Sequence, residues 1–206
     1  MLDTVVIHVK RSVVYAVTIA ALVASLVSCA PRTSSYHYEP WDGPVERLVI
    51  AVENTQRGLL QLVSEDELYP LALTIALGNP YVSQRFDIVN DRGKSDCDYR
   101  LIIRFVNGSF TNVSPPSFSL GKTRVKLAGK LISVDLTGRL VSCKTGRVLL
   151  SSHSNGAFFY LGNINIDYRD LMSTPGVEQV MEGTINASKK ALRDLIREIM
   201  GGLANG

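Results

Sequence analysis

Apolar residues follow a helical spacing most clearly near the end of the chain. From Val177 to Leu203 they recur every three or four residues, and charged residues fall largely between them. This spacing is typical of a long amphipathic helix with one apolar face. The pair Gly201 and Gly202 predicts where the helix stops. We expect its apolar stripe to cover a sheet.

A second helix is predicted earlier in the chain. Ser64 precedes three acidic residues, and Glu67 stands at the position of a capping box, so a helix begins here and runs to about Leu77. The sequence Gly-Asn-Pro at residues 78–80 predicts its end. Pro70 should kink or delay this helix, because it lies beyond the first helical position.

Short β-rich runs predict a sheet. Residues 46–53, 84–90 and 98–106 are expected to form three strands, with a turn at residues 91–96. The expected order of elements, which alternates early and ends in several consecutive strands and a helix, favours an α+β fold. We therefore expect a mixed or antiparallel sheet of about five strands, covered by one N-terminal helix and the long C-terminal helix.

Further strands are predicted after residue 123. Residues 124–141 alternate between apolar and polar positions, although the phase changes near Gly129, which suggests a bulge, and Gly138 suggests another bulge or a turn. The sequence Lys-Thr-Gly at residues 144–146 predicts the tight turn of a β-hairpin. Asn-Gly and Pro-Pro pairs predict a loop or a loose hairpin tip over residues 107–123. Residues 157–176 are expected to be irregular.

The N-terminus carries a different pattern. Residues 12–28 are an apolar run after Lys10 and Arg11, too short for a typical membrane span of about 20 residues and typical of a secretory signal. The run ends in Leu-Val-Ser-Cys at residues 26–29, which matches a lipobox. We interpret residues 1–28 as a lipoprotein signal peptide and Cys29 as the lipid-bearing first residue of the mature protein. The alternative is an ordinary signal or short anchor helix with a chance cysteine.

The residues after Cys29 resemble a linker. Residues 29–44 contain three prolines and little periodicity, so they predict a lipidated tether before a single periplasmic domain at residues 45–206. Trp41, the single tryptophan, either docks on a protein surface or stays a loosely packed linker residue. Ala30 follows the cysteine, which predicts anchoring in the outer membrane on its periplasmic face.

Composition narrows the classes of function. The 206 residues are 46% hydrophobic and 20% charged, which suits a folded core, and the net charge of +3 is too weak to predict nucleic-acid binding. His153, between Ser152 and Ser154, lacks the Gly-x-Ser-x-Gly pattern of a nucleophile. No spacing predicts zinc or a nucleotide loop. We expect no enzymatic activity, cofactor, metal or small-molecule substrate.

Two cysteines remain inside the domain. Cys97 opens one predicted strand and Cys143 closes another, so antiparallel neighbours would bring the two thiols together. An exported protein folds in an oxidising compartment, where such a pair forms a disulfide. Two buried thiols are the alternative.

One segment resembles a known family. The hairpin Leu-Val-Ser-Cys-Lys-Thr-Gly-Arg-Val-Leu at residues 140–149 is similar to a segment of the curli production assembly/transport lipoproteins (CsgG-like). The resemblance implies an anticodon-binding-domain-like fold, which lipoproteins that activate penicillin-binding proteins also resemble. The segments 107–131 and 155–176, candidates for that family's membrane-spanning hairpins, are short and interrupted by proline or glycine.

This departure favours an adaptor over a pore. We therefore expect a non-enzymatic accessory of envelope assembly or secretion, held to the membrane by acyl chains on Cys29. Its partner would be another envelope protein or itself as an oligomer. The alternative is a subunit of a CsgG-like oligomeric outer-membrane export channel.

Overall fold

The computed structural model describes residues 40–89, 96–113, 118–120, 123–125, 129–161 and 176–205. These residues belong to the unit Tyr38–Gly206. The predicted signal peptide, Cys29, most of the expected tether and most of the turn at 91–96 lie outside the described residues. No helix in the described part of the chain has the length and apolar character needed to cross a membrane.

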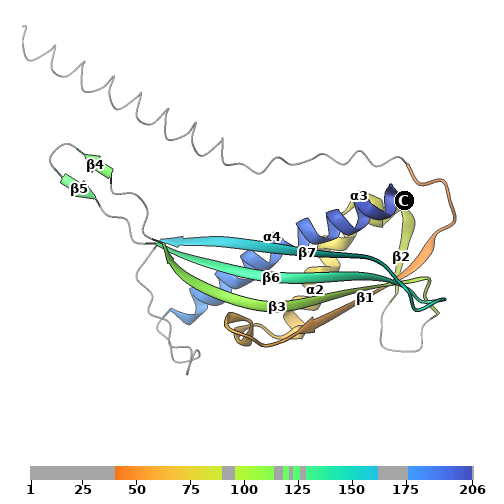
Figure 1. Ribbon diagram of the computed structural model, residues 1–206, viewed down its shortest axis with the longest axis horizontal. Helices are drawn as coiled ribbons and strands as arrows, with labels where there is room; N and C mark the ends of the chain where they lie inside the picture. Colours follow the sequence, from red (N-terminus) through yellow and green to blue (C-terminus); the bar gives the residue numbers. More distant parts are fainter. Residues whose placement is uncertain are drawn as a thin grey trace, which may run out of the picture. The chain divides into compact units, whose positions relative to one another are not determined.

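Five strands form one mixed sheet in the order β2-β1-β3-β6-β7 (Figure 1). β1, the second strand in this order, runs parallel to both of its neighbours, whereas β6 runs antiparallel to both β3 and β7. This arrangement confirms the expected α+β class. The bounds are Glu46–Asn54 for β1, Phe86–Val89 for β2, Tyr99–Val113 for β3, Gly129–Ser142 for β6 and Val148–Leu161 for β7.

The first helices connect β1 to β2. A 3-10 turn, η1, spans Leu59–Leu62, and α2 spans Glu65–Leu77 with the predicted capping box at Ser64 and Glu67. Pro70 lies inside α2, so the expected delay of the helix is wrong, because the capped first turn already forms ahead of it. A short helix, α3, spans Pro80–Arg85 and displaces the start of the second strand to Phe86.

The long helix α4, Val177–Ala204, lies on the same face of the sheet as α2 (Figure 1). Its buried side chains, including Leu192, Leu195 and Ile199, join the hydrophobic core, and the helix packs against β6 and β7. A helix of 28 residues is about 42 Å long, and a strand of 14 residues is about 46 Å long. The helix therefore matches the long strands in length.

The long strands correct the prediction that all of residues 107–123 form a loop or a loose hairpin tip. β3 continues to Val113, because residues 107–113 pair with residues 129–135 of β6, and the short strands β4, Phe118–Leu120, and β5, Thr123–Val125, form a hairpin of their own. Likewise β7 continues to Leu161 instead of becoming irregular at residue 157. Both predictions relied on local turn residues, whereas the pairing is long-range.

Four glycines also behave differently from the prediction. The register is unbroken from Gly129 to Asp135, and the irregularities lie between Phe105 and Asn107 and after Leu140. Gly138 makes no bulge; a Cβ there would lie 2.6 Å from Ile199 Cδ1, so this glycine admits α4 close to the sheet. The pair Gly201 and Gly202 lies inside α4, which ends three residues after Gly201, at Ala204.

Candidate functional site

Three parallel strands begin at the same end of the sheet, where the chain enters from the N-terminal segment. The register places Glu46 beside Phe86, and Leu48 beside Tyr99. Asn79 caps α3 by accepting hydrogen bonds from the backbone of Tyr81 and Val82, at 3.0 and 3.3 Å. This cap sets the helix so that its last residue, Arg85, reaches the starting ends of β1 and β3.

The side chain of Arg85 contacts an acidic residue and several aromatic residues at this end of the sheet. Its side chain is 9% exposed, and its Nε lies 2.6 Å from Glu46 Oε2. The guanidinium carbon lies 4.1 Å from the ring centre of Trp41 and within 5.8 Å of the rings of Tyr81, Phe86 and Tyr99. Burial opposes the charge, but hydrogen bonds to Glu46 and Tyr81 raise the pKa of Arg85 above its usual value. Arg85 is therefore a paired cation inside an aromatic cluster.

Of the two arrangements expected for Trp41, docked or loosely packed, the structure shows the docked one. Besides stacking on Arg85, its Nε1 donates a hydrogen bond to the carbonyl of Pro44 at 3.1 Å. Gly43 lies directly against the indole ring, where a Cβ would be 2.4 Å from Cζ2. The last residues of the expected tether, 29–44, thus pack on the strand end instead of hanging free.

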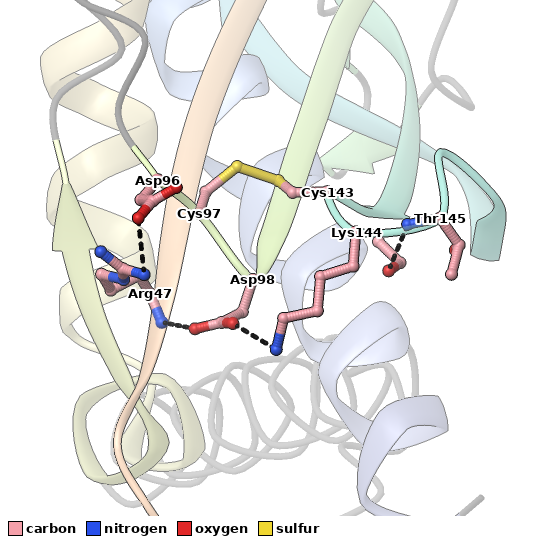
Figure 2. The surroundings of a disulfide bond; sticks show 8 residues. Arg47, Asp96, Cys97, Asp98, Cys143, Lys144 and Thr145 are labelled. Carbon is pink, nitrogen blue, oxygen red and sulfur yellow. Dashed lines mark hydrogen bonds and ion pairs between the residues drawn. A yellow bond between two sulfur atoms is a disulfide. The ribbon is translucent and has the colours of Figure 1, made fainter.

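The two cysteines meet at this same end of the sheet (Figure 2). Cys97 and Cys143 are bonded, with their sulfurs 1.98 Å and their Cα atoms 5.8 Å apart. The bond follows from the pairing of β3 with β6, in which Tyr99 lies opposite Ser142. It joins the residues just before β3 to the turn after β6.

Asp98 adds polar links beside the disulfide (Figure 2). One carboxylate oxygen accepts a hydrogen bond from the backbone of Arg47 at 3.0 Å, and the other lies 2.9 Å from Lys144 Nζ. These two interactions hold the pKa of Asp98 below its usual value. Lys144 belongs to the predicted Lys-Thr-Gly turn, whose Gly146 has a φ of 67°, in the left-handed region. The turn residues that suggested a hairpin therefore also tie β6 to β1.

His153 and the two serines beside it lie on opposite faces of β7. His153 is exposed on β7, opposite Thr137, while Ser152 donates to Glu198 of α4 and Ser154 is buried on the other face. Glu65 and Asp66 lie in the first turn of α2, as predicted. Within the described ranges, no group of histidine, cysteine and acidic residues could hold a metal ion.

The sheet face opposite α2 and α4 is open among the described residues and carries many charged side chains. Arg104 and Glu53 form an exposed ion pair at 3.4 Å, and Asn155 donates to Asp135 at 2.6 Å. The alternation that buries Leu101 and Ile103 places four arginines on this open face: Arg47, Arg100, Arg104 and Arg139. This set was not predicted from the sequence, although the spacing of Arg100 and Arg104 between the apolar positions 101, 103 and 105 was a signal.

Comparisons with known proteins give structural neighbours only. No family model matches the chain, and no curated protein matches its sequence. A Xanthomonas campestris protein of the DUF330 family is 13% identical, with a TM-score of 0.47, over 85% of this chain and 92% of that chain. A minor lipoprotein from Acinetobacter baumannii is 12% identical, with a TM-score of 0.38, over 79% and 94% of the two chains.

PelC from Paraburkholderia phytofirmans, solved as a dodecamer, is 12% identical, with a TM-score of 0.38, over 79% of this chain and 92% of that chain. Solved structures that resemble this protein thus include bacterial lipoproteins. The finer assignments that the sequence suggested, to the curli-secretion family or to activators of penicillin-binding proteins, stay predictions.

Proposed function

We propose that this protein is a lipid-anchored protein of the bacterial envelope that binds another envelope protein and acts without enzymatic chemistry, as an accessory in assembly or secretion. The lipobox at residues 26–29 supports the anchor. The stack of Trp41 on Arg85 supports a tether that ends at a defined point on the domain. The partner binds the open face of the sheet.

The open face is the observation that carries the protein-binding part of the proposal. Its four arginines exceed the three acidic residues that the strand register places on the same face, Glu53, Asp87 and Asp135, so the face favours an acidic surface. Arginine is enriched in protein interfaces, because its planar guanidinium pairs with carboxylates through two hydrogen bonds. Charge of this kind guides the encounter and selects the partner.

The anchor is tested by replacing the lipidated cysteine. Cys29→Ala should abolish labelling by a fatty-acid analogue and leave uncleaved precursor or released protein. Equal labelling of the variant and the wild type would contradict the anchor. Because Ala30 follows the cysteine, fractionation should find the wild-type protein in the outer membrane, and recovery from the inner membrane alone would contradict that location.

The partner surface is tested by reversing charge on each side of the domain. Capture of an envelope protein by the lipidated chain should be weakened by Arg139→Glu, which reverses the charge of an exposed side chain on the open face. Lys190→Glu, an equal reversal on the exposed side of α4, should leave capture unchanged. Equal effects of the two variants would contradict binding through the open face.

Particle size separates this function from the alternative, a subunit of an oligomeric export channel. An accessory protein should run in detergent as a monomer or small oligomer. A channel subunit should run as a large ring.

A further inference from the structure

β7 is an edge strand without the usual protection. It ends the strand order, and no described strand pairs with its outer side. Its 14 residues include no lysine, arginine, aspartate, glutamate or proline. Natural edge strands commonly carry such residues, because an unprotected edge pairs with other chains.

Exposed apolar side chains gather on the same strand. Val148, Leu149 and Phe159 are 53%, 45% and 44% exposed, and they make up three of the five large apolar residues that are exposed in the described part of the chain. The ring of Phe159 lies against Gly129 on the open face, and Leu149 lies at the irregularity near the start of the strand. The edge therefore has both unpaired backbone and apolar surface.

The sequence of β7 is complementary to itself around Ser154. Leu149 and Phe159 lie equally far from Ser154 along the strand. If two copies of β7 run antiparallel with their Ser154 residues opposite each other, each Leu149 faces a Phe159. In the same register, apolar Leu150 faces Phe158, and the polar pair His153 and Asn155 face each other. We propose that two copies of this chain dimerise by pairing β7 with β7 in this register.

Charge and strand length favour a second copy over a ring of copies. Like charges directly opposite each other destabilise a sheet, and self-pairing of β7 places no two like charges opposite each other. A ring would join β7 of one copy to the other edge, β2, which has only four residues and includes the exposed Asp87. The isologous dimer uses most of β7 on both sides and closes without leaving an edge of β7 free.

Engineered cysteines test the register. Full-length chains carrying His153→Cys and Asn155→Cys, produced together in one membrane, should form a disulfide-linked dimer on a non-reducing gel. The control pair carries Thr111→Cys in both chains, which is exposed on the same face of β3, two strands from the edge. A mixed sample that links no more than the Thr111→Cys control would overturn the proposal.

Charge exchange tests the apolar contact. Leu149→Lys and Phe159→Glu alone should each reduce the mass of the detergent-purified full chain from dimer to monomer, measured by light scattering. Together they should restore the dimer, because each introduced lysine then faces an introduced glutamate. A thermal midpoint for each variant shows that the fold is retained. A folded double variant that stays monomeric, or single variants as dimeric as the wild type, would overturn the proposal.

Discussion

At the scale of single residues, the entry end of the sheet depends on one buried cation. Burying a charge is costly unless it is paired and hydrogen-bonded. Arg85 meets this condition through Glu46, whose other oxygen accepts a hydrogen bond from Tyr99 at 3.3 Å. The aromatic rings complete the surroundings, and Trp41 is the member that comes from outside the sheet and helices. Its contribution can therefore be removed without disturbing a strand.

Trp41→Ala should lower the free energy of unfolding by about 1–2 kcal/mol, because a stacked cation is worth roughly that much when it is partly desolvated. Trp41→Phe keeps an aromatic face over Arg85 and should lose less. Thermal or denaturant unfolding of both variants checks the order. If Trp41→Ala left the free energy of unfolding unchanged, the stack of Trp41 on Arg85 would not contribute to stability.

Asp98 predicts a dependence of stability on pH. Its pKa is lowered in the folded protein by the hydrogen bond from the Arg47 backbone and by Lys144. The folded state thus binds the proton less readily than the unfolded chain, whose aspartates titrate near pH 3.9. The stabilisation is present above that pH and is lost as pH falls through the lower, folded pKa.

Asp98→Asn should therefore reduce stability at pH 7 and reduce it much less near pH 2. Denaturant unfolding at both values measures the difference. Lys144→Met is the matched variant for the ion pair, and it should remove part of the same dependence. An equal loss at both pH values would show that the charge of Asp98 contributes nothing.

At the scale of elements, α4 supplies the cover of the long strands. Leu195 is fully buried and would touch a Cβ placed on Gly138, whereas Arg193 is exposed. Leu195→Ala should cost about 2–5 kcal/mol, as large-to-small changes in cores do. Arg193→Ala should change stability little. Comparable thermal midpoints for the two variants would contradict this packing.

The elements also show which features a sequence can predict. The stripe of α4, the capping box at Ser64 and the turn at residues 144–146 are local patterns, and all three were predicted. The close contact between Gly156 and α4 was not predicted. A Cβ on Gly156 would lie 1.9 Å from the carbonyl oxygen of Ala187, and only the folded helix brings that atom near. Likewise, nothing near Trp41 in the sequence indicates Arg85.

At the scale of the whole molecule, the disulfide ties together strands that the chain visits far apart. Cys97 and Cys143 are 46 residues apart in sequence, and the bond joins the start of β3 to the end of β6. β3 starts and β6 ends at the end of the sheet where Trp41 packs on Arg85. A covalent link here resists separation of β3 from β6 at that end.

Removing this link should lower stability without changing the fold. In the chain-entropy model, a loop of this length is worth roughly 4 kcal/mol. The double variant Cys97→Ser and Cys143→Ser should therefore unfold at a clearly lower denaturant concentration than the oxidised wild type, and reductant should move the wild type toward the variant. Intact mass of the exported protein supplies the covalent evidence, because the bonded form lacks two hydrogen atoms that reduction restores. Two thiols that are alkylated before reduction would contradict the bond in the exported protein, and equal stability of variant and wild type would contradict its contribution.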